Sequence, residues 1–154
     1  MGRTFASDRE WRFGLAPDRL WDRLTAVDEY ARWWPWLREL DVDRGFVTAS
    51  RWRCEVAPPL PYVVRFTVAL ERVVDREQVT ATVDGDVQGT ARLTMQPDDD
   101  GTTTVRLVSD LVPANPVMRR FAAFAPALVR WGHDWVLDQG RRQFEQRALA
   151  DDRR

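Results

Sequence analysis

The feature that most constrains the fold is a succession of β-type segments that leads into one long amphipathic helix. From residue 39 onward the chain alternates β-branched runs with short turns rich in Asp and Gly, such as 84–86 and 98–101. This spacing is typical of an antiparallel meander. The expected strands are 39–44, 46–56, 62–75, 77–84, 87–97 and 102–112.

The segment after the last strand predicts the longest helix of the chain. Asn115 and Pro116 form an N-cap and first-turn pair, and apolar residues recur as far as Phe144. Pro126 should divide this helix into a short piece and a longer one over 127–147. Because the helix is strongly amphipathic, it needs a large apolar partner, and the sheet is the obvious one.

The first 36 residues predict one strand and two short helices. Residues 9–15 alternate as a half-buried strand does, and Pro17 begins a helix that runs to Thr25. A second helix is expected from Asp28 to Trp34, where Pro35 ends it. The whole pattern predicts an α+β fold in a single domain over 1–154, with a cavity between the curved sheet and the long helix.

Composition excludes several classes of function. The chain has 23 Lys and Arg against 24 Asp and Glu, so no basic surplus is available to hold nucleic acid. One cysteine and one histidine cannot build a usual zinc site or an internal disulfide. No apolar run approaches the roughly 20 residues that span a bilayer. The N-terminal residues carry charges where a signal peptide needs an apolar run, so we expect a cytoplasmic protein without an integral membrane segment.

Four segments, taken in order, resemble a known superfamily. They are FGLAPDRLWDRLTAVDEYARWWP, RWRCEVAPPLPYVVRF, VDGDVQGTARLTM and RWGHDWVLDQGRRQF. Together they resemble the polyketide cyclase/dehydrase-like branch of the START/Bet v 1-like proteins, the SRPBCC superfamily, over about residues 5 to 149. The resemblance implies the helix-grip fold, a curved antiparallel sheet of six to seven strands around a long C-terminal helix. It implies no metal and no cofactor.

Large aromatic and apolar side chains are the candidate walls of the cavity. In this fold the segment ARWWPWL lies near the cavity mouth, so its tryptophans either contact a ligand or fill the edge of the core. A helical wheel of the C-terminal segment places apolar residues and one amide on the face toward the sheet, and strand alternation adds an inward set. The candidate ligand-binding residues are Trp33, Trp34, Trp36, Trp52, Tyr62, Phe66, Phe121, Leu128, Trp135 and Gln139.

Two side chains are candidates for catalysis. His133 is the single histidine, and its unperturbed pKa near neutrality suits a general acid or base; the alternative is a structural histidine at the edge of the helix stripe. Arg65 is a candidate holder of an enolate or carboxylate, as arginines are in cyclases of this superfamily. Alternation places Arg65 opposite Phe66 but does not say which face looks into the cavity.

Two classes of function are carried forward. The first is binding of a hydrophobic small molecule, such as a lipid, polyketide or aromatic compound, with or without cyclase or dehydratase activity. The second is a protein-interaction module of the same fold, like relatives that act on chaperones, quinone or ribosomes. A carrier or enzyme requires an apolar cavity, whereas an interaction module requires a collapsed cavity and an exposed apolar patch. The sequence leaves catalysis and the oligomeric state open.

Overall fold

A computed structural model describes residues 5–149 and contains one seven-stranded antiparallel sheet. The strand order across the sheet is β1-β7-β6-β5-β4-β3-β2, so the N-terminal strand pairs with the last one and the others form a meander. The strands are β1 (Phe5–Phe13), β2 (Leu37–Val42), β3 (Arg51–Val56), β4 (Val64–Val74), β5 (Gln78–Gly85), β6 (Val87–Pro97) and β7 (Thr103–Pro113). The predicted α+β helix-grip fold is confirmed.

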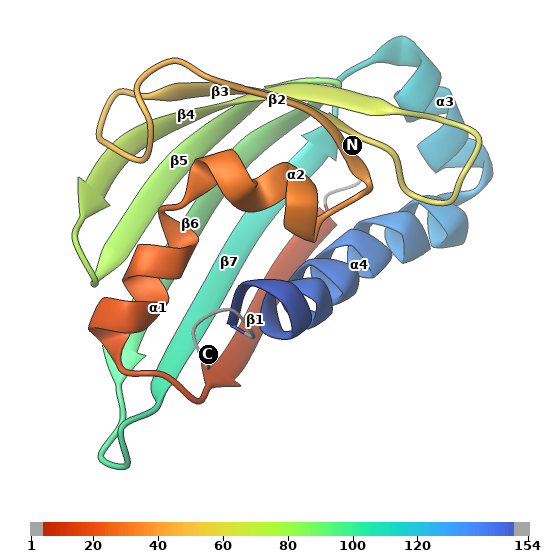
Figure 1. Ribbon diagram of the computed structural model, residues 1–154. Coiled ribbons are helices and arrows are strands. Elements are labelled where there is room, and N and C mark those ends of the chain that lie inside the picture. Colours follow the sequence, from red (N-terminus) through yellow and green to blue (C-terminus); the bar gives the residue numbers. More distant parts are fainter. Residues whose placement is uncertain (1–4, 150–154) are drawn as a thin grey trace.

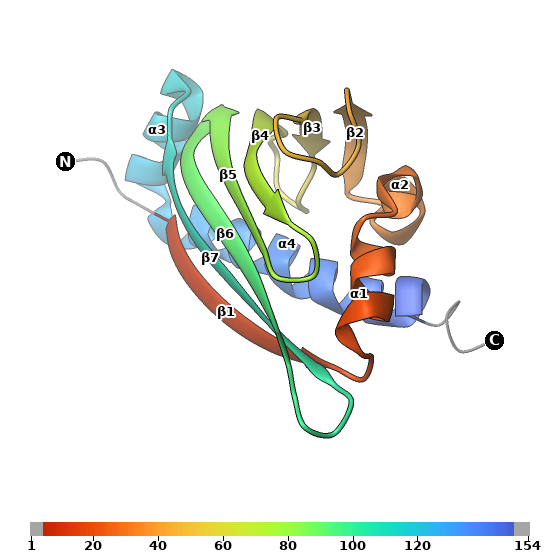
Figure 2. The same ribbon diagram turned by 90° about the vertical axis from the view of Figure 1, so that its left-hand side faces the viewer.

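Helices lie on the concave side of the strongly curved sheet (Figures 1 and 2). The short helix α1 (Pro17–Leu24), a 3₁₀ turn (Val27–Glu29) and α2 (Tyr30–Trp33) connect β1 to β2. After β7 the chain forms α3 (Pro116–Phe124) and then α4 (Pro126–Gln143), which runs across the concave face and ends in a π-helical turn, Phe144–Ala148. None of the helices within 5–149 is long and apolar enough to cross a membrane.

The helix boundaries follow from local chemistry. The Asn115 side chain accepts a hydrogen bond from the backbone N–H of Val117 at 2.7 Å, which caps α3 as predicted. Ala125 has φ −134° and ψ 63°, outside the helical region, and Pro126 begins α4. This confirms that Pro126 divides the C-terminal helix, because a proline inside a helix removes one backbone donor and clashes with the preceding turn.

Two expected strands have different bounds in the structure: the first, expected over 9–15, spans Phe5–Phe13, and the one expected over 46–56 begins later. Residues 46–50, predicted as the start of a strand, form a loop, and β3 begins at Arg51. The Asp43 carboxylate accepts hydrogen bonds from the Arg51 backbone N–H at 2.8 Å and the Ser50 hydroxyl at 3.2 Å. Ala49, with φ +75°, takes a left-handed conformation that ends the loop. These contacts turn the chain before β3 can start.

Glycine permits a close contact between two strands of the sheet. Gly89 has φ +155°, and a Cβ at this position would lie 1.9 Å from the carbonyl oxygen of Asp110 on β7. A side chain would push β6 and β7 apart.

The core is solid at one end of the sheet. At the end covered by α1 and α2, aromatic rings pack edge to face, among them Trp33 against Phe144 at 5.5 Å and Phe46 against Trp52 at 5.3 Å between ring centroids. Tyr30 lies at the centre of this cluster and donates its hydroxyl to the backbone carbonyl of Leu24. Such aromatic pairs are well-packed core contacts. The end covered by α3 has smaller side chains and is hollow.

Candidate ligand cavity

A cavity of about 240 Å³ lies between the concave face of the sheet and α4, at the α3 end. Its wall is almost entirely apolar and comes from β3 to β7, from α3 and α4, and from the loop that joins β3 to β4. The lining residues are Val56, Pro58, Tyr62, Val64, Phe66, Val83, Val87, Ala91, Leu107, Ser109, Leu111, Met118, Val129, Gly132, His133, Val136 and Leu137. A mostly apolar pocket with a few polar groups is typical of small-molecule sites.

Strand alternation explains why the wall is apolar and also why it is hollow. Side chains at alternate positions share a face, so Val87 and Ala91 of β6 and Leu107 and Leu111 of β7 all point toward α4. These side chains are smaller than the aromatic residues of the other end. They therefore do not reach α4, and space remains between sheet and helix.

The loop between β3 and β4 packs directly on α4 because residue 132 is glycine. A Cβ on Gly132 would lie 2.6 Å from Leu60 Cδ1 and 3.0 Å from the Tyr62 hydroxyl oxygen. The Tyr62 ring also contacts Phe121 of α3 edge to face, with centroids 5.4 Å apart. Tyr62 thus joins the loop, α3 and α4 at the margin of the cavity.

Three polar side chains line this otherwise apolar space. They are the hydroxyls of Tyr62 and Ser109 and the imidazole of His133. Ser109 is 8% exposed, and its cross-strand partner is Ser7 of β1, whose buried hydroxyl has no hydrogen-bond partner among the residues described. Burial raises the pKa of Tyr62, so its hydroxyl stays protonated and can donate a hydrogen bond.

The protonation of His133 is set mainly by burial. Desolvation lowers its pKa, while the neighbouring Asp134 carboxylate, 3.3 Å from Nδ1, works in the opposite direction. Arg130 and Arg9 add a smaller lowering effect, and Arg9 reaches Asp134 from β1 at 3.1 Å. With its pKa below the ordinary 6.5, the imidazole is neutral at pH 7 and can accept a proton or a hydrogen bond.

Three of the predicted site residues line the cavity. Tyr62, Phe66 and His133 are in its wall, and Phe121 packs on Tyr62 at its margin. His133 therefore lies within the inward face of α4, not at the edge of the apolar stripe where the wheel placed it.

Four of the five predicted tryptophans belong to the solid end of the core instead. Trp33 is 2% exposed, and the Trp52 indole N–H donates to the Gly45 carbonyl and the Ser50 hydroxyl, both at 3.1 Å. The Trp34 indole donates to the Gly140 carbonyl at 2.9 Å, and the Trp36 indole to the Gln143 side chain at 2.8 Å. None of these indoles lines the cavity. The segment ARWWPWL thus anchors the C-terminal half of α4.

The helical wheel selected the wrong face at three positions. Leu128 is 40% exposed, and neither Trp135 nor Gln139 lines the cavity. The wheel treated Phe121 and Leu128 as residues of one continuous helix, but the break at Ala125 gives α3 and α4 different axes. The inward face of α4 is centred on Val136, which moves these three side chains to its flank.

Arg65 points away from the cavity. Of the two orientations that alternation left open, the structure has the outward one: the side chain is 71% exposed and its Nε donates to the Glu55 carboxylate at 2.7 Å. Phe66, the next residue, faces inward. Arg65 therefore cannot hold an enolate or carboxylate inside this cavity.

Sequence reasoning missed Ser109, although a signal for it was present. It occupies an inward position of β7 between Leu107 and Leu111, where a polar residue interrupts an apolar series. The lining residues Val129 and Val136 of α4 were not among the predicted site residues either. Pro58 lies in the loop before Tyr62, where no periodicity indicates a direction.

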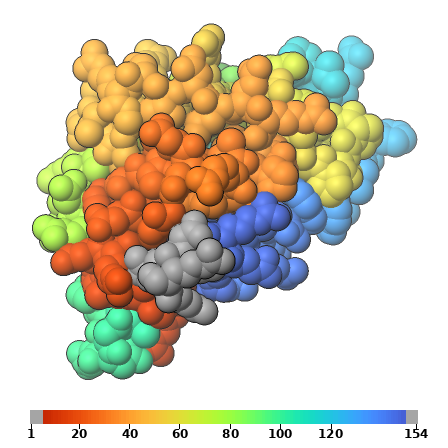
Figure 3. All heavy atoms as spheres, in the orientation of Figure 1, coloured from red at the N-terminus to blue at the C-terminus, as the bar shows by residue number. Residues whose placement is uncertain are grey.

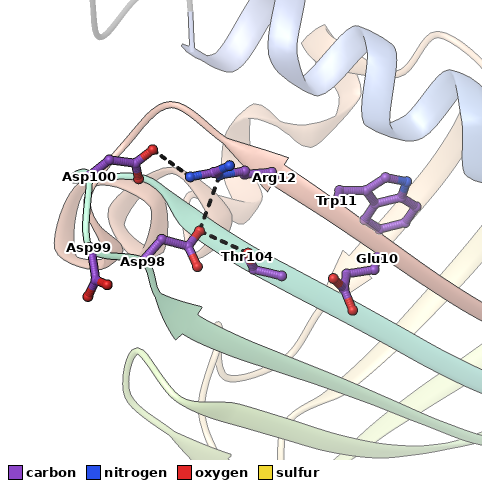
Figure 4. A pocket seen from close by; sticks show the side chains of 7 residues that line it. All are labelled: Glu10, Trp11, Arg12, Asp98, Asp99, Asp100 and Thr104. Atoms are coloured by element: carbon purple, nitrogen blue, oxygen red, sulfur yellow. Dashed lines mark hydrogen bonds and ion pairs between the residues drawn. The ribbon is translucent and has the colours of Figure 1, made fainter.

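A second hollow, of about 560 Å³, is a charged surface feature (Figure 4). It lies between β1 and the turn after β6. Arg12 contacts Asp100 at 2.5 Å and Asp98 at 3.5 Å, and the Thr104 hydroxyl donates to Asp98 at 2.9 Å. The Asp98 and Asp100 carboxylates are already partnered, and no cluster suited to a metal ion occurs among residues 5–149. The smaller apolar cavity is therefore the better candidate for a ligand site.

Comparison with known proteins places the chain in a family. A search of curated proteins finds no match. Among solved structures, TTHA0849 from Thermus thermophilus superposes with a TM-score of 0.78 at 17% identity, covering 95% of this chain and 98% of that one. A START superfamily protein from Mycobacterium smegmatis gives 0.71 at 12% identity, covering 94% and 97%.

The Zhui aromatase/cyclase from Streptomyces sp. R1128 also gives a TM-score of 0.71, at 13% identity, covering 97% of this chain and 93% of that one. At these identities the likeness shows the fold. The sequence itself matches the model of the family described as polyketide cyclase/dehydrase and lipid transport over residues 7–145. The chain therefore belongs to the polyketide cyclase/dehydrase and lipid transport family.

Proposed function

We propose that the protein binds one small, mostly apolar molecule in the cavity between the sheet and α4. The observation that carries the proposal is the cavity itself, whose wall is apolar except for Tyr62, Ser109 and His133. A carrier or enzyme of this fold needs such a space, whereas an interaction module with a filled core does not. The family assignment supports the same conclusion.

The cavity volume indicates the size of the ligand. A cavity of about 150 Å³ accommodates benzene, and pockets for drug-sized molecules begin at about 300 Å³. At about 240 Å³ this cavity suits a compound of one or two aromatic rings. A diacyl lipid or a long polyketide chain is too large for it. The ligand is therefore a compact aromatic or cyclised molecule.

The polar side chains indicate that the ligand carries a hydroxyl or carbonyl group. A buried polar group of a ligand needs a hydrogen-bond partner, and Ser109 or Tyr62 supplies one without introducing charge. His133 is the lining residue that titrates nearest to neutral pH, so any proton transfer on the bound molecule falls to its imidazole. Such a transfer is the step that a cyclase or dehydratase requires.

The test compares binding of 2-naphthol, naphthalene and palmitate by isothermal titration calorimetry. We expect 2-naphthol to bind most tightly, because it fills the space and offers one hydroxyl, and palmitate to bind weakly. Ser109→Ala should weaken the binding of 2-naphthol and leave the binding of naphthalene unchanged. Loss of one neutral hydrogen bond corresponds to about 1 kcal/mol, or roughly fivefold in Kd.

A matched pair of variants ties binding to the cavity. Ala91→Leu adds bulk to an inward position of β6 and should abolish 2-naphthol binding. Thr90→Leu places the same leucine side chain at the adjacent position on the outer face of the same strand and should have no effect. If wild-type protein binds none of the three compounds, or if Ala91→Leu binds 2-naphthol as wild type does, the proposal is wrong.

A further inference from the structure

We propose that the outer faces of α3 and the first turns of α4 form a docking surface for an anionic lipid bilayer. We call this surface, defined by Val117, Phe124, Leu128 and Trp131, the α3–α4 ridge. The inference concerns the outside of the molecule, so it does not depend on a ligand in the cavity.

The ridge exposes large apolar side chains that the fold leaves uncovered. Phe124 is 91% exposed, Val117 71%, Trp131 48% and Leu128 40%. Single exposed apolar residues are normal, but a concentration of them marks an interaction site. Within residues 5–149, Val47 is the one other large apolar residue exposed to this degree. It lies in the loop between β2 and β3, outside α3 and α4.

Helix geometry makes the ridge continuous on α3. Val117 and Phe124 are seven residues apart and therefore share one face, and Arg120 lies between them on that face. The opposite face of α3 is buried through Met118 and Ala122. On α4, Leu128 and Trp131 are three residues apart and are likewise neighbours.

The charge of the ridge complements an anionic surface. Between Asp110 and Asp134 the sequence contains three arginines, Arg119, Arg120 and Arg130, and no Asp or Glu. Arg130 contacts the Asp134 carboxylate at 3.7 Å and the Ala6 carbonyl at 3.0 Å, so the unneutralised positive charge of the ridge comes mainly from Arg119 and Arg120 on α3. All three arginines are exposed. Since the whole chain has a net charge of −1, the rest of it carries −4. A cationic amphipathic helix with Phe and Trp on its apolar side is typical of segments that lie in the membrane interface.

The shape of the ridge favours a bilayer over a folded protein partner. α3 projects from one corner of the molecule, clearly visible in Figures 1 and 3 as the segment coloured cyan. A fully projecting phenylalanine needs a preformed pocket on a rigid partner, whereas the interfacial region of a bilayer deforms around it. Met118 and Val129, on the inner faces of the same two helices, line the cavity. Docking would thus hold the α3 end of the cavity at the membrane surface.

The test is flotation of the full chain with vesicles. One vesicle type is phosphatidylcholine alone, and the other is an equal mixture of phosphatidylcholine and phosphatidylglycerol. We expect binding to the mixed vesicles, weak binding to phosphatidylcholine, and a loss of binding as salt is raised. Arg120→Gln should weaken binding to the mixed vesicles about fivefold, because one arginine near an anionic surface contributes about that factor to the affinity.

Paired variants distinguish binding through the ridge from nonspecific adsorption to the vesicles. The double variant Phe124→Ser and Trp131→Ser should weaken binding by at least about tenfold, because two apolar anchors are removed. Val47→Ser, at an equally exposed apolar residue outside the ridge, should bind as wild type does. Circular dichroism confirms that each variant folds, as expected for exposed positions.

Three results would overturn the proposal. The first is the absence of flotation with either vesicle type. The second is flotation that the ridge variants leave unchanged. The third is a wild-type protein that does not bind vesicles and sediments as a dimer, while the double variant Phe124→Ser and Trp131→Ser sediments as a monomer. A second copy of the chain would then cover the ridge. If the partner of the ridge were an acidic protein instead of a bilayer, flotation would also be absent with both vesicle types.

Discussion

Replacing His133 by glutamine should remove most of the loss of stability that the protein suffers between pH 7.5 and pH 5.5. Burial lowers the pKa of His133 in the folded state, whereas the unfolded chain has the ordinary value of about 6.5. Below that value the unfolded state binds a proton that the folded state resists. The stability contributed by the neutral imidazole is therefore present above pH 6.5 and is lost as the pH falls toward the folded-state pKa.

The magnitude follows from proton linkage. If the folded state stays unprotonated, moving from about pH 7.5 to about pH 5.5 favours the unfolded state by about 1.4 kcal/mol. With a denaturant slope of about 2 kcal/mol per molar urea, the unfolding midpoint moves by about 0.7 M. Partial protonation of the folded state makes the shift smaller, so this is the upper bound.

The assay is urea unfolding of the wild type and His133→Gln at the two pH values. His133 is the only histidine of the chain, so no other imidazole contributes. The pKa values of Asp8, Asp43 and Asp100 are held below the ordinary value by hydrogen bonds to arginine, serine, threonine and backbone groups, which keeps these carboxylates ionised throughout. The difference between the two proteins therefore isolates His133.

A single histidine also gives a single imidazole signal in proton NMR, which reports the folded-state pKa directly. We expect a value below 6.5 that falls further when 2-naphthol fills the cavity, since the ligand removes remaining water. An NMR pKa at or above 6.5 would refute the reasoning. So would a variant that loses as much stability as the wild type, because the Asp134 carboxylate would then compensate for burial.

Three further variants and one labelling experiment test other parts of the structure. Trp33→Ala should destabilise by about 3–5 kcal/mol in urea unfolding, since it empties a buried aromatic site. Gly89→Ala should cost about 2–3 kcal/mol by the same assay, because its Cβ would collide with the Asp110 carbonyl. Cys54, whose thiol pKa burial raises to about 12, should resist iodoacetamide near pH 8 until urea unfolds the protein. Arg65→Gln should leave 2-naphthol binding unchanged, because Arg65 lies outside the cavity.

The fold could be predicted because its signals are local and repeated. Alternation in residues 87–97, the turns at 84–86 and 98–101 and the cap at Asn115 each indicate one element, and all agree with one architecture. The loop before β3 was missed because hydrogen bonds to the Asp43 side chain create it. A propensity pattern does not contain such a contact, since it depends on which side chain meets which backbone group.

The site was less predictable because it depends on absolute orientation. Alternation established that Phe66 and Arg65 face opposite ways, but the inward face is decided by where α4 lies. The wheel placed Leu128 inside because it ignored the change of axis at Ala125. Ser109 could have been found by asking which inward strand position is polar.

The aromatic cluster explains how a cavity persists in so small a domain. A cavity is unfavourable by about 24 cal/mol for each Å³ that the surroundings fail to fill, so α4 would tend to settle onto the sheet. The indoles of Trp34 and Trp36 hold the C-terminal half of α4 through Gly140 and Gln143. At its other end Gly132 rests against the loop that carries Leu60 and Tyr62. Held at two points, the helix spans the small side chains of β6 and β7 without collapsing onto them. Trp34 and Trp36, which the sequence predicted to contact a ligand, therefore stabilise the cavity indirectly, because they hold α4 at its distance from the sheet.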